Sequence, residues 1–248
     1  MNKIVIYTAA FGKNYGFIPQ KKIKGVDFFC FTDDIKKVVA PWKPIEVKFE
    51  GDNNVLRNRH PKLLPHLYFS NYEISIYIDS NFLIVGDIYE LLKSLNGFKM
   101  ATFDHAQSDD SRDCIYKEYE AILALMKQTG QAKDNPKVMS DQIVGFELDN
   151  YPKENGLIKG GVLVRKHNDV EVIKVMEDWW KIVSTQSKRD QLSFNYVAWK
   201  NNFIHKIIDG DIRRGNSYFY FLASARKNYL QKLIKYKIKR FLGIKKHP

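Results

Sequence analysis

The sequence predicts an α/β fold, in which a mixed, mostly parallel sheet is flanked by helices. Short runs of apolar and β-branched residues, such as 3–9 and 74–78, alternate along the chain with segments whose apolar residues recur at helical spacing, such as 172–183. Of the 248 residues, 44% are hydrophobic and 27% are charged, which suits one large globular domain. We therefore expect a single domain over 1–224, followed by a basic tail over 225–248.

The expected strands are apolar runs short enough to be buried in a sheet. In chain order they cover 3–9, 27–31, 45–49, 74–78, 99–103, 157–165 and 203–208. Capping residues and apolar periodicity predict helices over 87–95, 115–127, 168–183 and 191–199. The segment 57–72 is helical or rich in turns because Pro61 and Pro65 interrupt it, and Asn135-Pro136 marks a break.

The strand at 74–78 delivers an acidic residue at its carboxyl end. Asp79 follows the apolar run directly, and Asn81 adds a second oxygen donor two residues later. Ligands of open α/β sheets bind outside such strand ends, and Mg²⁺ or Mn²⁺ takes oxygen donors and shares its coordination with phosphates. The motif therefore suits a metal-bound nucleotide diphosphate, although an Asp in this place also commonly begins a turn or caps a helix.

Several common nucleotide-binding and hydrolytic motifs are absent from the sequence. The chain has no GxxxxGK[ST] loop and no GxGxxG after its first strand, which disfavours phosphate-loop ATPases and common dinucleotide dehydrogenases. It has neither GxSxG nor HExxH, the signatures of many hydrolases. Its two cysteines, Cys30 and Cys114, lie far apart and fit neither a zinc site nor a disulfide framework.

Further motifs occur in a fixed order over most of the chain. They are Tyr7-Thr8-Ala9 with Gly12, 27–33, Arg57, Arg59, Lys62, 64–66, 75–81, His105, 112–116, 165–167, Trp179-Trp180 and 187–194. In these motifs the chain resembles a glycosyltransferase-like family whose members include plant cell-wall and mucilage proteins and bacterial polysaccharide-cluster proteins. The resemblance runs from about Tyr7 to Phe221 and leaves out the basic tail.

The resemblance implies a GT-A fold, in which a Rossmann-like sheet binds a nucleotide sugar through an Asp-x-Asp element. That element reads Asp79-Ser80-Asn81 here, so that a neutral amide replaces the second carboxylate and either binds the metal more weakly or contacts ribose. The stretches 160–163 and 190–195 resemble a strand and a helix of glycosyltransferase family eight, except that Leu192 replaces an Asp. This second likeness implies sugar or acceptor contacts for Asp190 and Gln191.

The strand ends and the resemblance together suggest roles for individual residues. The candidates for nucleotide binding are Thr8, Ala9, Phe11, Asp33, Arg57, Lys62 and Gly161. The candidates for catalysis are Asp190, Gln191, Asp104 and His105, those for the metal are Asp79, Asn81 and His205, and those for the acceptor are Arg112 and Arg165. Structural alternatives stay open, because Asp33 can cap a turn and because Arg57 and Lys62 can be solvated surface charges.

The basic character of the chain is concentrated in its tail. The net charge is +12, and 225–248 holds nine Lys and Arg residues and no acidic residue. Apolar residues recur among these charges at helical spacing, at Leu230, Leu233, Ile234, Ile238, Phe241 and Leu242. Such a helix can lie in the headgroup region of an anionic membrane, or it can pack on the domain with its charges in water. Basic stretches with aromatics also bind nucleic acid, but no recognised motif supports that reading.

These observations lead us to expect a metal-dependent glycosyltransferase that uses a UDP-sugar and Mn²⁺ or Mg²⁺. The expected acceptor is a polysaccharide or a lipid-linked glycan in bacterial surface-glycan synthesis. No apolar run of the sequence is long enough to cross a membrane, so we expect a cytoplasmic protein, peripheral on the inner face of the plasma membrane. The alternatives are a catalytically inactive module that binds nucleotides or sugars, suggested by Asn81 and Leu192, and a nucleic-acid-binding protein that uses its tail.

Overall fold

The computed structural model describes residues 3–12, 17–108, 111–213, 215–222 and 229–243. Its strands are β1 (Ile4–Ala10), β2 (Val26–Thr32), β3 (Lys43–Ile45), β4 (Ile74–Ile78), β5 (Phe82–Ile84), β6 (Met100–Asp104), β7 (Ile158–Arg165), β8 (Lys206–Ile207) and β9 (Phe219–Phe221). Its helices are α1 (Asn54–Leu63), α2 (Ile88–Ser94), α3 (Ile115–Thr129), α4 (Pro136–Leu148), α5 (Val170–Thr185), α6 (Phe194–Lys200) and α7 (Tyr229–Phe241), with the 3-10 turns η1 (Ile35–Lys37), η2 (Pro65–Leu67) and η3 (Asp190–Leu192).

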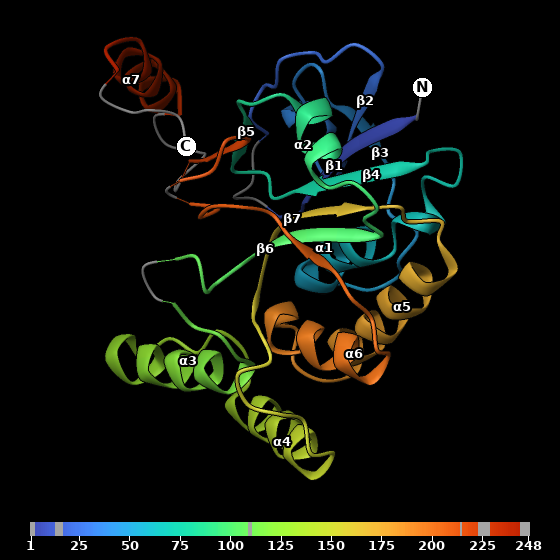
Figure 1. Cartoon of the computed structure of the whole chain (residues 1–248), viewed down its shortest axis with the longest axis vertical. Coiled ribbons are helices and arrows are strands. Elements are labelled where there is room, and N and C mark those ends of the chain that lie inside the picture. Colours follow the sequence, from blue (N-terminus) through green and yellow to red (C-terminus); the bar gives the residue numbers. More distant parts are fainter. Residues whose placement is uncertain (1–2, 13–16, 109–110, 214, 223–228, 244–248) are drawn as a thin grey trace.

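Seven strands form one sheet in the order β3-β2-β1-β4-β7-β6-β8 (Figure 1). Every neighbouring pair is parallel except the two pairs that contain β7. Strands β5 and β9 form a separate antiparallel pair. The predicted mixed, mostly parallel sheet is therefore confirmed. Because β7 alone of these seven strands is reversed, the carboxyl ends of β1, β4 and β6 share one edge, where β7 begins.

Helices cover both faces of the sheet, and its central strands are buried on both sides, as parallel strands usually are. Successive residues of a strand point to opposite faces. In β1, Val5 and Tyr7 face the core that contains α5, while Ile4 and Ile6 face the core that contains α2. Helices α3 and α4 contact each other and lie beyond the sheet, at the lower end of the molecule in Figure 1.

Strands β3, β5, β8 and β9 and helix α4 differ from the prediction. Strand β3 lies ahead of the expected 45–49, and β8 has only two residues. The pair β5–β9 was not predicted, since three residues are too few to show a period. Asn135-Pro136 begins helix α4 instead of marking a break, because Asn135 caps this helix and Pro136 occupies its first position, where the missing N–H costs nothing.

The predicted basic C-terminal helix is confirmed as α7. None of the helices in the described ranges is long and apolar enough to span a bilayer.

Candidate active site

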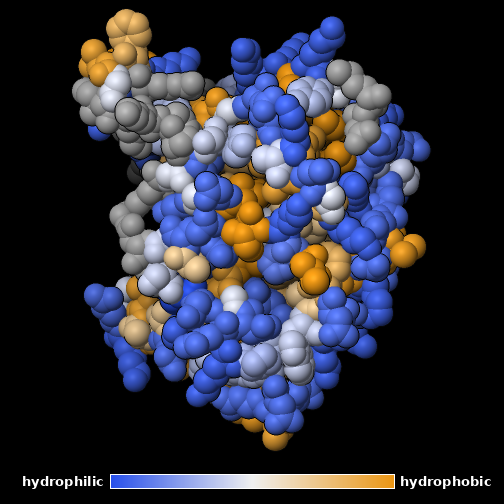
Figure 2. Space-filling model, viewed as in Figure 1, coloured by the Kyte–Doolittle hydropathy of each residue, from blue (hydrophilic) through white to orange (hydrophobic). Residues whose placement is uncertain are grey.

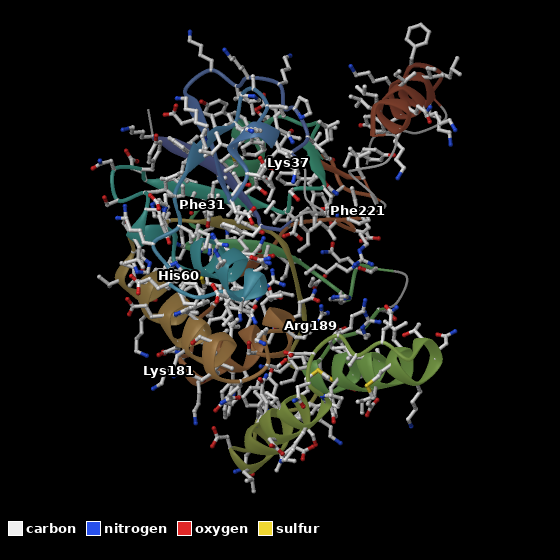
Figure 3. All side chains as sticks on the ribbon, turned by 180° about the vertical axis from the view of Figure 1, so that it is seen from behind. Phe31, Lys37, His60, Lys181, Arg189 and Phe221 are labelled. Carbon is white, nitrogen blue, oxygen red and sulfur yellow. The ribbon has the colours of Figure 1, made fainter. Side chains whose placement is uncertain are left out.

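A cavity of about 200 Å³ opens where β4 ends and β7 begins. It is lined by Arg59, Lys62, Asp79, Phe82, Lys159, Gly160, Gly161, Arg189, Asp190, Gln191, Ile212, Arg213 and Phe221. Five of these side chains are cationic and two are carboxylates, so the lining carries a net positive charge. In Figure 3, Arg189 and Phe221 mark the two sides of this region. Ligands of α/β proteins commonly bind at such a sheet edge.

A buried ion-pair cluster forms the inner wall of the cavity. Lys62 Nζ lies 2.6 Å from Asp190 Oδ2, and Arg59 Nη2 lies 3.2 Å from Asp190 Oδ1. The side chains of Lys62 and Asp190 are 3% and 5% exposed. Burial alone raises the pKa of the Asp190 carboxyl, but Arg59 and Lys62 outweigh it and hold that pKa well below its usual range. Asp190 is therefore ionised and shared between two cations.

The turn η3 is held in place by helix α5. The indole of Trp179 is fully buried, and its Nε1 donates hydrogen bonds to Asp190 O at 3.0 Å and to Ser193 Oγ at 3.1 Å. The sequence pattern of α5 predicts that Trp179 is a packed residue, and its burial confirms this. The same indole fixes the backbone of Asp190, so α5 sets the position of the carboxylate that Lys62 and Arg59 share.

Arg165 lies in the core next to the ion-pair cluster and does not face the cavity. Its side chain is fully buried, and its guanidinium donates to Lys62 O at 2.8 Å and to the Tyr7 hydroxyl. The prediction of an acceptor contact for Arg165 is wrong, because β7 points this side chain into the core below α1. Its hydrogen bond to Lys62 O instead supports the end of α1, from which Lys62 extends.

Asp79 reaches the cavity from the end of β4, with 41% of its side chain exposed. Its Oδ1 accepts a hydrogen bond from the Tyr77 hydroxyl at 2.9 Å and lies 4.0 Å from Lys62 Nζ. Burial, followed by the charge of Asp79, raises the pKa of Tyr77 far above its ordinary value, so this hydroxyl stays protonated and donates. The second carboxylate oxygen of Asp79 faces Gly161.

Gly160 and Gly161 line the cavity. The register between β6 and β7 shifts next to them, since Thr102 pairs with Leu163 but Phe103 pairs with Lys159. A Cβ on Gly161 would lie 3.1 Å from Ile212 Cδ1 and 3.3 Å from Asp79 Oδ2. Gly161 therefore lines the cavity, and its missing side chain leaves room for the Asp79 carboxylate; nucleotide binding at Gly161 stays a prediction.

Lys159, Arg189 and Arg213 complete the cationic lining. Lys159 Nζ lies 3.2 Å from Asp211 Oδ1, and Arg189 Nη2 lies 3.4 Å from Glu118 Oε1. The guanidinium of Arg213 lies over the ring of Phe221, 5.5 Å from its centre. None of these three was among the predicted site residues. Lys159 lies in the predicted strand 157–165 and Arg189 in the motif 187–194, but a single basic residue in such a segment does not show which way its side chain points until the fold is known.

The side chains of the catalytic candidates Gln191 and His105 are in contact. Gln191 lines the cavity, and its Nε2 lies 3.1 Å from His105 Nε2 and 3.2 Å from Ile158 O. Because an amide N–H donates, His105 Nε2 accepts. Asp104 lies at the end of β6, where its Oδ1 accepts hydrogen bonds from Gln107.

Arg112 is not among the lining residues, and it reaches the cavity through a relay. Its Nε lies 2.8 Å from Glu118 Oε2, and Glu118 in turn pairs with Arg189. An acceptor contact of Arg112 stays a prediction.

The remaining nucleotide candidates form a second group at the end of β1. Both carboxylate oxygens of Asp33 accept from Gly12 N, at 3.1 and 2.9 Å, so Asp33 fixes the turn after β1. The Arg57 guanidinium lies 4.7 Å from the centre of the Phe11 ring. Ala9 O accepts from Asn58 Nδ2 at 2.6 Å, and Thr8 is fully buried within the sheet. Arg57 and Lys62 were predicted together, but only Lys62 lines the cavity.

The metal candidates do not come together as a group. The described residues contain no cluster of three or more His, Cys, Asp and Glu side chains that could hold an ion. His205 precedes β8, and the pairing of Lys206 with Ala101 places it level with Met100 at the start of β6, away from the strand end that carries Asp79. Its ring packs 5.1 Å from that of Phe194. The prediction that His205 joins Asp79 is therefore wrong.

Asp79 and Asn81 nevertheless fit a cation that shares its ligands with a substrate. Mg²⁺ is commonly held by one or two carboxylates together with phosphates and water, and the exposed side of Asp79 can serve as such a ligand. Asn81 Oδ1 is buried and has no hydrogen-bond partner in the described part of the chain. A buried carbonyl oxygen without a partner is costly, so a bound cation or donor would relieve it.

The sheet, the polar strand end and the cation-lined cavity suit a protein that binds an anionic ligand at a sheet edge. The chain belongs to the TOD1/MUCI70 glycosyltransferase-like domain family, whose model matches residues 19–215. This confirms the family that the sequence motifs resemble.

Two individual proteins are similar over large parts of the chain. The Arabidopsis thaliana protein described as probable hexosyltransferase MUCI70 is 25% identical over 176 residues, which are 67% of this chain and 29% of that protein. The chain thus spans less than a third of the length of this relative. The apo structure of the bifunctional glycosyltransferase WbbM aligns with 83% of this chain and 38% of its own, at 10% identity and a TM-score of 0.44.

Proposed function

We propose that the chain transfers a hexose from a UDP-sugar to a glycan or lipid-linked acceptor, and that its cationic cavity binds the diphosphate. The observation that carries this proposal is the lining itself, in which Arg59, Lys62, Lys159, Arg189 and Arg213 surround two glycines at a strand end. Arginine forks and lysine ammonium groups are the side chains that proteins use for phosphate oxygens. The family membership supports the transferase class, and the description of the plant relative as a probable hexosyltransferase supports a hexose.

The ion-pair cluster gives the proposed diphosphate site a fixed geometry. Asp190 forms ion pairs with Lys62 and Arg59 at the inner wall of the cavity, so both cations are positioned before the ligand arrives. Such preorganised charges stabilise a developing negative charge without reorganisation during the reaction. A diphosphate leaving group develops negative charge when its bond to the sugar breaks. The arrangement therefore suits the departure of a nucleoside diphosphate.

The proposed reaction exchanges one bond of the anomeric carbon for another. The bond to the terminal diphosphate oxygen breaks, and its electron pair leaves with the nucleoside diphosphate. The hydroxyl oxygen of the acceptor bonds to the anomeric carbon and gives its proton to a base on the acceptor side. Gln191 faces the cavity beside this reaction, while Asp104 and His105 lie at the next strand end and stay our candidates for the acceptor side.

A divalent cation would be held by Asp79, with Asn81 as a second oxygen donor. When bound, it would neutralise part of the charge on the diphosphate. The nucleoside would extend towards the end of β1, where Phe11, Arg57 and Asp33 lie.

The release of UDP from a panel of UDP-hexoses tests this proposal. We expect the chain to release UDP, with Mn²⁺ or Mg²⁺ present, from at least one donor, and faster when a glycan acceptor is added. A catalytically inactive binding module would bind UDP but release none from any donor, and that result would overturn the proposal. Lys181→Gln, on an exposed position of α5, is the matched control for any loss seen in variants of the cavity.

A further inference from the structure

Helix α7 carries apolar residues on two different faces. On the inner face, Tyr236 is 5% exposed, and its ring stacks on that of Tyr220 with centres 4.1 Å apart and an interplanar angle of 23°. Leu233 packs against the small cluster of Ile18, Leu83 and Leu222. These contacts hold α7 on the β5–β9 pair, so the inner face is already occupied.

The outer face is a stripe of apolar side chains in solvent. Leu230, Ile234, Ile238 and Phe241 are 57%, 55%, 51% and 91% exposed. Their spacings of four, four and three residues put them on one side of a helix that turns about 100° per residue. Figure 2 shows hydrophobic side chains at the corner of the molecule where α7 lies. Scattered exposed apolar residues are ordinary, but an aligned row on one helix marks an interaction surface.

Lysines flank this stripe. The helical positions of Lys235 and Lys237 lie on opposite sides of the row, and both side chains are exposed. Lys232 and Lys239 lie further from the stripe around the helix than Lys235 and Lys237 do. The sequence from Ala225 to Pro248 contains no Asp or Glu. The surface thus combines a row of apolar side chains with positive charge on both of its edges.

We infer that the outer face of α7 docks on an anionic lipid surface. Helices of this kind lie in the plane of a bilayer, with the apolar stripe among the acyl chains and the lysines among anionic headgroups. A second copy of the chain is a poorer partner, because two such faces would bring their lysines together. Nucleic acid would use the lysines but would leave the apolar stripe in water.

The position of α7 gives this docking a consequence for the cavity. Tyr220 and Phe221 are neighbours on β9, and neighbouring residues of a strand point to opposite sides. Tyr220 stacks on α7, whereas Phe221 lines the cavity. The membrane helix therefore lies directly behind one cavity wall, which would hold the cavity near the lipid surface. This consequence rests on the proposed function, whereas the docking itself does not.

Sedimentation of the full chain with lipid vesicles tests the inference without any assay of activity. We expect the protein to sediment with vesicles that contain phosphatidylglycerol, and much less with vesicles of phosphatidylcholine alone. Raising the salt should release it, because the screening length falls from about 30 Å at 0.01 M to about 3 Å at 1 M. The double variant Ile234→Ser, Ile238→Ser should bind at least about tenfold more weakly, since two buried side chains are lost from the bilayer.

Matched changes elsewhere provide the control. Leu148→Ser with Val170→Ser also removes two exposed apolar side chains, each 78% exposed, and should leave vesicle binding unchanged. The inference is overturned if the chain does not bind anionic vesicles, or if the α7 double variant binds like the wild type. It is also overturned if the α7 variant changes the sedimenting mass of the protein without lipid, because the stripe would then be a contact between copies of the chain.

Discussion

Lys62 Nζ lies 2.6 Å from Asp190 Oδ2, although 128 residues separate the two in the sequence. The contact joins α1 to the turn that follows α5, and Arg59 binds the other oxygen of the same carboxylate. The cluster thus ties two distant segments of the chain together at the cavity. It contributes both to the stability of the fold and to the charge that a ligand would meet.

Replacing Asp190 by Asn should destabilise the protein strongly. The variant would leave Lys62 and Arg59 buried against a neutral amide, and removal of one partner of a buried pair typically costs about 3–5 kcal/mol. Urea unfolding measures this loss. Asp141→Asn is the control, because its pair with Lys137 is exposed and such pairs contribute at most about 1 kcal/mol. Equal losses in the two variants would show that the cluster is not a buried ion pair.

The stability of the fold should fall as the pH drops below neutrality. Burial lowers the pKa of His167 to about 4, and its Nε2 donates to Phe69 O at 2.8 Å. Because the folded pKa lies below the unfolded value of about 6.5, this stabilisation is complete above about pH 6.5 and is lost as the pH falls towards 4. His60 and His205 shift in the same direction, also to about 4.

Unfolding in urea at a series of pH values measures this slope, which is at most about 1.4 kcal/mol per pH unit for each histidine. His167→Gln should make the slope shallower. A wild-type stability that stays constant from pH 7 to pH 5 would contradict the assignment of buried, neutral histidines.

Asp79→Asn should abolish the metal-dependent part of the turnover while the fold is kept. The amide has the same size but loses the charge that would bind a cation, and loss of a key electrostatic contact typically costs at least about a hundredfold in rate. UDP release, followed with and without Mn²⁺, is the measurement. Asp209→Asn, an exposed carboxylate outside the cavity lining, should behave like the wild type. An Asp79→Asn variant that still responds fully to Mn²⁺ would exclude Asp79 as the ligand.

Gly161→Ala and Gly160→Ala should differ although they are neighbours. A methyl group at Gly161 would crowd Phe82, Ile212 and Asp79 at 3.1–3.3 Å. At Gly160 the nearest atom is Lys62 Nζ at 3.5 Å, an ordinary contact distance. We expect Gly161→Ala to weaken UDP binding by about tenfold, which is about 1.4 kcal/mol, and Gly160→Ala to have a smaller effect. Calorimetric titration measures the affinity of both variants for UDP. Equal affinities would show that a methyl group at Gly161 does not disturb the Asp79 carboxylate.

The sequence predicts the sheet and its main helices because their signals are local. The apolar run before Asp79 and the period of α5 each reveal an element without knowledge of the rest of the chain. The prediction lacks helix α4 even though its signal is local, because an Asn-Pro pair is typical both of a helix start and of a turn. The pairing of β5 with β9 joins Phe82 to Phe221, and no local pattern in either segment indicates it.

The candidate site was predictable only in part, because its geometry depends on distant contacts. Asp79, Lys62, Asp190, Gln191 and Gly161 line one cavity, and motif resemblance pointed to each of them. Arg165 was misplaced because arginine is rarely fully buried, so the residue type itself suggested an exposed role. The sequence marks the strand that holds Lys159 and the motif that holds Arg189, but it does not show that these two cations and Arg213 meet at one cavity.

Calorimetric titration with UDP and with uridine, in the presence of Mn²⁺, tests the central claim most directly. The comparison uses the wild type, Arg213→Gln at the cavity and Lys181→Gln on α5, both at exposed positions (Figure 3 labels Lys181). We predict that Arg213→Gln weakens UDP binding by about tenfold to a hundredfold, the value of one charge-assisted hydrogen bond, and leaves uridine binding unchanged. Lys181→Gln should match the wild type for both ligands. A wild-type protein that binds no UDP, or an Arg213→Gln variant with unchanged affinity for it, would contradict a diphosphate site in this cavity.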